Sequence, residues 1–171
     1  MNRYRTSVFR VIAFLLLVAT GGCGTYSFTG ASIPPGTESV SISFFENRAG
    51  IIQPSLSSTF TEKLKDRFVS QTNLRLVPNN GDLHFEGYIS DYQSRPVAIQ
   101  GNEQAALNRL TITVSVNFKN KKDPKQDFDS SFSRYVDYDS RKNLSTVEQE
   151  LISEICQQLT EDIFNKAVIN W

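Results

Sequence analysis

Alternating apolar and polar residues predict β-strands along much of the chain. Val40, Ile42 and Phe44 alternate with serines, which is the period of a strand with one buried face. The strictest alternation runs over 110–118, where Leu, Ile, Val, Val and Phe occupy every second position. Other strands are predicted around 74–76, over 82–92 and over 128–136.

Two segments instead repeat apolar residues every three or four positions, which predicts amphipathic helices. The first covers about 54–70 and follows a loop over 47–53. The second is about 25 residues long and begins near Ser145, which forms a capping box with Glu148. The two apolar stripes are Leu56, Phe60, Leu64 and Phe68, and then Val147, Leu151, Ile152, Ile155, Cys156, Leu159, Ile163 and Phe164.

The predicted order of elements is β-α-β-β-β-β-α, with hairpin-length loops between several strands. Such loops imply antiparallel pairing, with both helices on the same face of the sheet. We therefore expect one α+β domain over 39–171, in which two helices pack on one face of a mostly antiparallel sheet of four to five strands. The other face carries Ser, Thr, His, Glu and Tyr, and it either contacts water or meets a partner.

Residues 1–22 have the form of a secretory signal peptide. Three arginines precede the nine-residue apolar run 11–19, and small residues occupy 20–22. The run is too short to cross a bilayer core of roughly 30 Å. Cys23 follows directly, which predicts a lipoprotein whose Cys23 carries the lipid anchor. Thr20 departs from the usual lipoprotein signal, where Leu is commonest, and an ordinary cleaved signal with an incidental cysteine is the alternative.

The segment 23–38 is rich in Gly, Ser, Thr and Pro, and it is interpreted as a lipidated tether or as an extended segment lying on the domain. Several acyl chains on Cys23 would hold the protein firmly at a membrane. No Asp follows Cys23 to mark retention at an inner membrane, so the expected location is the outer membrane, facing the periplasm.

The charge balance argues against a nucleic-acid partner. The chain has 18 basic and 18 acidic residues, and removing the three leader arginines leaves 15 basic against 18 acidic. A nucleic-acid-binding domain normally carries a clear basic excess.

The sequence offers little for catalysis or metal binding. His84 is its one histidine, so histidine clusters are excluded and a catalytic triad has a single candidate base. No phosphate-cradling glycine motif occurs. An acid–base pair among the carboxylates of the last strand stays open, although a solvated polar face is the favoured interpretation. These are Asp127, Asp129, Asp137 and Asp139. We expect no enzyme, no cofactor and no metal site.

The two cysteines do not predict a disulfide, because lipid would occupy the sulfur of Cys23. Cys156 lies among apolar residues at helical spacing, and a small buried thiol is expected there.

Basic residues are the candidate contacts for an anionic lipid. Lys119, Lys121, Lys122 and Lys125 cluster at a predicted hairpin tip, where they either bind phosphates or only keep the loop soluble. Arg95, Arg109 and Arg134 are dispersed candidates for the same role.

A long loop is predicted over 93–108, and long loops in compact domains are often functional. Pro96, Val97 and Ile99 in this loop either contact a partner or fold back on the core.

Several short motifs, in order along the mature chain, resemble the LptE lipopolysaccharide-assembly lipoproteins, and most closely those of Bacteroidota. They are 23–30 (CGTYSFTG), 41–45 (SISFF), 68–72 (FVSQT), 81–83 (GDL), 96–102 (PVAIQGN), 109–113 (RLTIT), 132–134 (FSR), 159–165 (LTEDIFN) and 170–171 (NW). Each motif is structural and weak, but together they are fairly specific.

The resemblance implies a two-helix, four- or five-stranded sandwich that plugs the lumen of a large LptD-type β-barrel and helps to move lipopolysaccharide to the outer leaflet. It also implies that basic residues of the domain contact lipopolysaccharide. The main alternative is a periplasm-facing lipoprotein that scaffolds another envelope complex, such as a barrel-assembly or secretion accessory. A soluble ligand-binding or enzymatic domain is disfavoured because no polar constellation supports it.

Overall fold

The computed structural model describes residues 33–97 and 107–168. Its elements, in chain order, are β1 (Ser39–Ile42), β2 (Glu46–Asn47), α2 (Leu56–Gln71), β3 (Arg75–Leu76), β4 (Leu83–Val97), β5 (Leu107–Asn120), the short 3₁₀ helix η1 (Pro124–Gln126), β6 (Phe128–Asp139) and α3 (Leu144–Val168).

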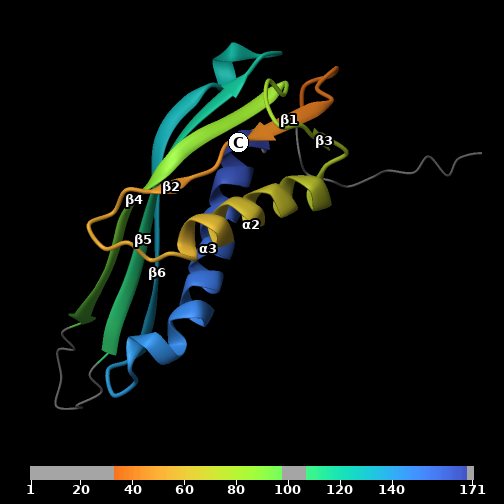
Figure 1. The fold of residues 1–171 in the computed structure, drawn as a ribbon. Coiled ribbons are helices and arrows are strands. Elements are labelled where there is room, and N and C mark those ends of the chain that lie inside the picture. Colours follow the sequence, from red (N-terminus) through yellow and green to blue (C-terminus); the bar gives the residue numbers. More distant parts are fainter. Residues whose placement is uncertain (1–32, 98–106, 169–171) are drawn as a thin grey trace, which may run out of the picture.

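The strands form one mixed sheet in the order β3-β1-β4-β5-β6, and β2 pairs with β4 (Figure 1). β4, β5 and β6 are antiparallel neighbours, as the sequence predicted. β1 instead runs parallel to β3 and β4, because α2 carries the chain back between β1 and β3. The α+β class is confirmed, in a sheet of six strands with a parallel side.

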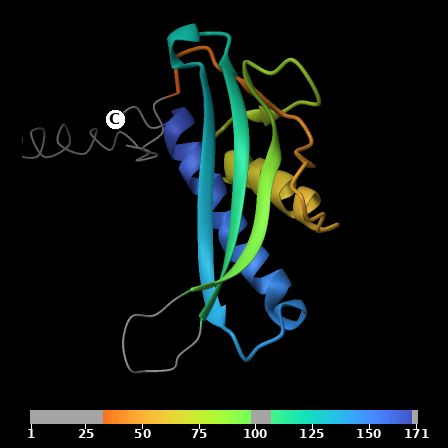
Figure 2. The ribbon, with the colours of Figure 1, turned by 90° about the vertical axis from the view of Figure 1, so that its left-hand side faces the viewer.

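Both helices cover the same face of the sheet, as expected (Figure 1 and Figure 2). The predicted stripes of α2 and α3 point at the sheet, and all their members but the half-buried Val147 are buried. Phenylalanine rings join the layers: Phe68 of α2 lies 4.8 Å from Phe85 of β4 and 5.0 Å from Phe164 of α3, measured between ring centroids. Burying these rings together with the aliphatic core residues stabilises this sheet-and-helix arrangement.

β4 is longer than the alternation predicted. The sequence placed residues 93–97 in a loop, but they continue β4 and pair with residues 107–111 of β5. A bulge lies between Ile89 and Asp91, so the buried positions change from odd to even numbers and Tyr92 becomes the next buried residue. A bulge inserts one residue and reverses the alternation, which is why the pattern seemed to stop there.

The prediction that Phe44 is buried is wrong, because its side chain is 57% exposed. β1 ends at Ile42, and the chain then turns so that Phe45 faces the core. The Phe45 ring packs edge-on against Phe60 of α2 at 5.0 Å between centroids.

The predicted capping box of α3 is also wrong. Helix α3 begins at Leu144, and the Asn143 side-chain oxygen accepts a hydrogen bond from the Ser145 backbone N–H at 3.1 Å. Asn143 is therefore the capping residue. Glu148 accepts hydrogen bonds from Tyr92 of β4 and from Gln53 before α2, so it joins three elements instead of capping its own helix.

Candidate functional site

The sheet face opposite the helices is polar over most of the three-stranded ribbon β4-β5-β6, with Val97 and Leu107 paired at one end. Strict alternation turns the aliphatic residues of β5 toward the helices and leaves Thr111, Thr113, Ser115 and Asn117 on the other side. Each of these β5 residues lies opposite one residue of β4 and one residue of β6, so the three side chains form a row across the strands. Examples are Gln93–Thr111–Tyr135 and Glu86–Asn117–Asp129. We call this surface the polar sheet face; no helix covers it in Figure 2.

An arginine pair occupies one end of the polar sheet face. Arg95 of β4 lies directly opposite Arg109 of β5 in the register. The Arg109 guanidinium binds both carboxylate oxygens of Asp137 in β6, at 2.7 and 2.8 Å, and stacks 3.6 Å from the centre of the Tyr135 ring. The Asp137 carboxylate raises the pKa of Arg109, and Arg109 in turn lowers the pKa of Asp137. For Arg95 the structure gives no ion pair within the described residues, so this end keeps one uncompensated positive charge.

The predicted lysines do lie together at the β5–β6 hairpin tip, but most of them contact polar groups of the protein itself. The Lys119 ammonium lies 3.2 Å from Asp127, and that of Lys122 lies 3.5 Å from Asp82. Lys121 donates a hydrogen bond to the Asn80 carbonyl oxygen at 2.7 Å. Only for Lys125, among the four, is no such partner found in the described part of the chain.

Asn120 explains why the tip folds in this way. Its buried side-chain oxygen accepts hydrogen bonds from the backbone N–H groups of Lys122 and Asp123, and its amide donates to Gln126. Asn side chains commonly satisfy turn backbones like this. The tip is therefore an ordered turn, and the contacts of its lysines contribute to the structure.

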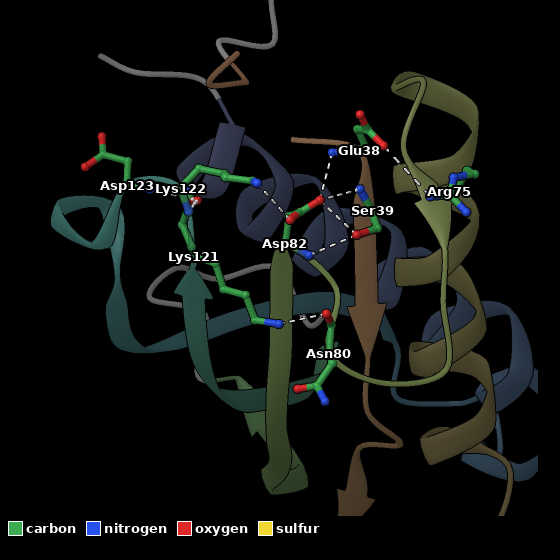
Figure 3. Close-up of polar contacts among 9 residues, drawn as sticks. Glu38, Ser39, Arg75, Asn80, Asp82, Lys121, Lys122 and Asp123 are labelled. Atoms are coloured by element: carbon green, nitrogen blue, oxygen red, sulfur yellow. Dashed lines mark hydrogen bonds and ion pairs between the residues drawn. The ribbon is translucent and has the colours of Figure 1, made fainter. Parts of the chain in front are cut away.

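Asp82 fastens the beginning of the domain to this tip (Figure 3). One of its oxygens accepts hydrogen bonds from the Glu38 N–H at 2.9 Å, and from the Ser39 N–H and hydroxyl at 3.1 and 2.9 Å. Lys122 approaches the other oxygen. The hydrogen bond from Glu38, followed by that from Ser39 and the charge of Lys122, lowers the pKa of Asp82 to about 2. The chain therefore enters the domain at the end where the lysines lie.

Arg134 does not share a surface with the other arginines. It lies on the helix side of β6, where its guanidinium binds both oxygens of Asp162 in α3 at 2.6 and 2.7 Å. The sequence grouped it with Arg95 and Arg109, but its position in the strand places it on the opposite face.

The structure contradicts the prediction of a loop at Pro96 and Val97. Both residues lie in β4, opposite Asn108 and Leu107 of β5. Pro96 is exposed and Val97 is half-buried. Ile99 lies outside the described residues.

Sequence reasoning missed a shallow hollow in the polar sheet face. About 390 Å³ in volume, it is lined by Ser43, Arg48, Glu86, Gly87, Tyr88, Ser115, Asn117 and Asp129. The Arg48 guanidinium lies 4.8 Å from the centre of the Tyr88 ring. Arg48 had been placed in a plain loop, and only the pairing of β2 with β4 brings it to this face.

His84 has a serine and a glutamate beside it, as in a hydrolase triad, but the geometry does not support catalysis. His84 Nδ1 lies 2.8 Å from the Ser41 hydroxyl, and Nε2 lies 3.7 Å from a Glu86 oxygen. Ser41 is fully buried and accepts a hydrogen bond from the Gly81 N–H, so its hydroxyl cannot reach a substrate. Within residues 33–97 and 107–168, no three His, Cys, Asp or Glu side chains are grouped to hold a metal ion.

Comparison with known proteins decides the family. A family model described as LptE: Lipopolysaccharide-assembly matches residues 37–167. The chain belongs to the LptE family. LptE proteins are non-enzymatic lipoproteins of lipopolysaccharide assembly, so membership associates this chain with the lipopolysaccharide-transport machinery. A search of the curated proteins found no match.

Solved structures resemble this chain at low sequence identity. A hypothetical protein from Chlamydia trachomatis is 9% identical with a TM-score of 0.52, over 78% of this LptE chain and 99% of that chain. A minor lipoprotein from Acinetobacter baumannii is 15% identical with a TM-score of 0.48, over 77% and 96%. Rare lipoprotein B from Shewanella oneidensis is 16% identical with a TM-score of 0.47, over 74% and 89%. At 9% identity the likeness to the Chlamydia trachomatis protein supports the fold alone.

Neither LptE helix in the described ranges is long and apolar enough to cross a membrane.

Proposed function

We propose that this LptE-family chain is an outer-membrane lipoprotein, held by lipid on Cys23, that occupies the lumen of a large LptD-type β-barrel. In this role it would help to pass lipopolysaccharide to the outer leaflet. Family membership supports the lipopolysaccharide part of the proposal. The barrel partner and the anchor are inferred from the sequence motifs.

The polar sheet face is the main structural support for the proposed plug role. The lumen of a large outer-membrane barrel is polar, whereas its lipid-facing side is apolar. A protein inside such a lumen needs a broad surface of hydrogen-bonding groups. The rows from β4 to β6 offer hydroxyls, amides and charges, and the aliphatic side chains on this face are Val97 and Leu107, in the row at one end of the ribbon. Most of the apolar side chains are packed between the sheet and the two helices.

Arg95 and Arg109 are the best-placed residues for contact with lipopolysaccharide phosphates. Like charges directly opposite each other on a sheet are unfavourable, and here only Arg109 has a carboxylate beside it in the described chain. A phosphate bound between the two guanidinium groups would relieve the repulsion, and Arg suits phosphate because it donates two parallel hydrogen bonds. Lys119, Lys122 and Arg134 pair with acidic side chains, as Arg109 does, but no second arginine without an ion pair lies opposite them, so they are ranked lower.

Site-specific photo-crosslinking tests the plug role. A photoreactive residue at Thr111, on the polar sheet face, is expected to crosslink a large β-barrel in outer membranes. The same residue at Ser58, exposed on α2, serves as the matched position on the helix side. Crosslinks to a different envelope complex, or recovery of the lipidated protein without any barrel, would refute the proposed function.

Cys23→Ala tests the anchor. The variant should fold normally, because the described residues pack around a core of their own, but it should leave the membrane fraction. Retention of Cys23→Ala in the outer membrane after a high-salt wash would show that a protein partner, not lipid, is the main anchor.

Arg95→Glu tests the phosphate contact. It should lower the amount of lipopolysaccharide that co-purifies with the protein, whereas Arg75→Glu, at the β3 end of the sheet, should not. Equal losses in the two variants would mean that only overall charge matters.

A further inference from the structure

The shallow hollow in the polar sheet face presents hydrogen-bonding groups that the protein itself leaves unused. Among the described residues, no hydrogen bond joins the side chains that line it from Tyr88, Ser115 and Asn117. One row further along β5 the situation differs, because the hydroxyls of Thr113 and Ser133 lie 3.0 Å apart and bind each other. The hollow therefore gathers free donors and acceptors at one place on the face.

Asn117 is the clearest of these groups. Its side-chain oxygen is buried and has no hydrogen-bond partner within the described residues. The residue lies in the row Glu86–Asn117–Asp129, between two carboxylates that only accept hydrogen bonds when they are charged. Buried polar atoms in native proteins nearly always have a partner. A donor seated in the hollow would supply one after a rotation of the Asn117 amide.

Charge decides which class of ligand suits the hollow. The carboxylates of Glu86 and Asp129 disfavour an anion, and the guanidinium of Arg48, 4.8 Å from the centre of the Tyr88 ring, disfavours a metal ion. An apolar ligand is also disfavoured, because every side chain that lines the hollow carries a polar group. The remaining class is an uncharged ligand rich in groups that both donate and accept hydrogen bonds.

We propose that the hollow binds uncharged sugar rings of a saccharide chain. Each sugar hydroxyl both donates and accepts, so one ring meets the Ser115 hydroxyl and the oxygens of Asn117 and Asp129 together. The Tyr88 ring adds an aromatic surface for the C–H groups of a sugar. At about 390 Å³ the hollow lies at the lower end of the roughly 300–1,000 Å³ typical of small-molecule pockets, which suits about one or two rings.

This saccharide site is separate from the arginine pair proposed for phosphate. Arg109 and Asn117 are eight residues apart on β5, which is roughly 27 Å at about 3.4 Å per residue. Two sources of sugar have the required chemistry in a bacterial envelope. One is the sugar chain of lipopolysaccharide, and the other is a glycan strand of peptidoglycan.

Saturation-transfer difference NMR tests the site with one probe for each source. The full chain in mild detergent is mixed with the lipid-free oligosaccharide released from lipopolysaccharide, or with a tetramer of N-acetylglucosamine that represents the glycan strand. Saturation of the protein should reach the ring protons of at least one probe, and the probe that responds identifies the source. Transfer to neither probe would overturn the proposal.

A side chain that fills the hollow tests the position of the site. Ser115→Phe should lose most of the saturation transfer, because the ring occupies the space of the sugar. Thr111→Phe is the matched control, because it lies on the same strand and face, is half-buried like Ser115 and does not line the hollow. Melting curves of both variants check the fold. Equal transfer in the two variants would place the sugar elsewhere and refute the site.

Asp129→Asn separates sugar binding from cation binding. The amide keeps an oxygen acceptor and loses the charge, so transfer to the sugar should persist. Calcium chloride should likewise not compete with the sugar in the wild-type chain. Loss of transfer in Asp129→Asn, or competition by calcium, would indicate a cation site and overturn the proposal. The barrel takes no part in these experiments, so their failure would leave the proposed plug role standing.

Discussion

Arg134 of β6 and Asp162 of α3 form a bidentate ion pair that connects the last strand of the sheet to the last helix. Both guanidinium–carboxylate contacts are short, and the Asp162 carboxylate raises the pKa of Arg134. The pair explains why an arginine follows Phe132 and Ser133 at an otherwise half-apolar edge. The ion pair gives Arg134 a structural partner, and the contact with lipopolysaccharide suggested by the sequence stays a prediction.

Removing both partners should reveal this coupling. Exposed ion pairs contribute up to about 1 kcal/mol to the free energy of unfolding, and bidentate arginine–carboxylate pairs lie at the upper end of that range. A double-mutant cycle of Arg134→Ala and Asp162→Ala, measured by urea unfolding, should give a coupling free energy of about 0.5–1 kcal/mol. A coupling free energy near zero would mean that the ion pair does not contribute to the stability of the domain.

Asp82 should make the stability of the domain depend on acid pH. Its pKa is lowered to about 2, first by the hydrogen bond from Glu38, so the folded state favours the charged carboxylate. This stabilisation is complete above the ordinary carboxyl pKa and is lost as pH falls toward 2. Asp139, whose pKa is also about 2 because of Arg141, adds to the same trend. The unfolding free energy should therefore fall between pH 4 and pH 2, with a shallower slope in Asp82→Asn. Identical slopes in wild type and variant would contradict this role.

Gly87 should not tolerate a side chain. A Cβ there would lie 2.0 Å from the Ser115 carbonyl oxygen and 2.7 Å from the Phe45 ring. Gly87→Ala must move backbone or core, so it should lower the unfolding free energy by about 2–3 kcal/mol. Gly50→Ala is the matched control, because nothing lies within 4 Å of its Cβ, and it should change stability by less than about 0.5 kcal/mol. A small effect at Gly87 would show that β4 and β5 separate easily.

Cys156 should be unreactive in the folded protein. It is fully buried in α3, and burial raises the pKa of its thiol to about 12, against a small opposing effect of Lys63. Because the thiolate is the reactive form, an aromatic disulfide reagent at pH 8 should label Cys156 only after unfolding in urea. The Cys23→Ala variant isolates this signal. Rapid labelling under native conditions would mean that α3 opens readily.

The sequence predicted the helices better than the sheet. The stripes of α2 and α3 are local patterns, set by the 3.6-residue period of a helix, and they proved correct nearly residue by residue. The sheet depends on partners that are distant in sequence. The bulge between Ile89 and Asp91 hid the second half of β4, and the parallel pairing of β1 was invisible because the crossover through α2 decides it.

The candidate site shows the same division. The sequence located the basic residues, and it placed the lysines correctly at one hairpin tip. It could not show that Asp82 and Asp127 hold two of those lysines, or that Arg134 faces α3 while Arg109 lies on the opposite face. Arg48 reached the polar sheet face through a two-residue strand that no periodicity could reveal.

The sequence by itself determined the class of fold, the buried faces of both helices and, through its short motifs, the resemblance to the LptE family. These follow from nearest-neighbour spacing, which fixes where each side chain points along its own helix or strand. The tertiary structure alone decided which charges are paired within the described residues and which of the described strands lie at the edges of the sheet. Those properties depend on the distance between side chains far apart in the chain, and only packing sets that distance.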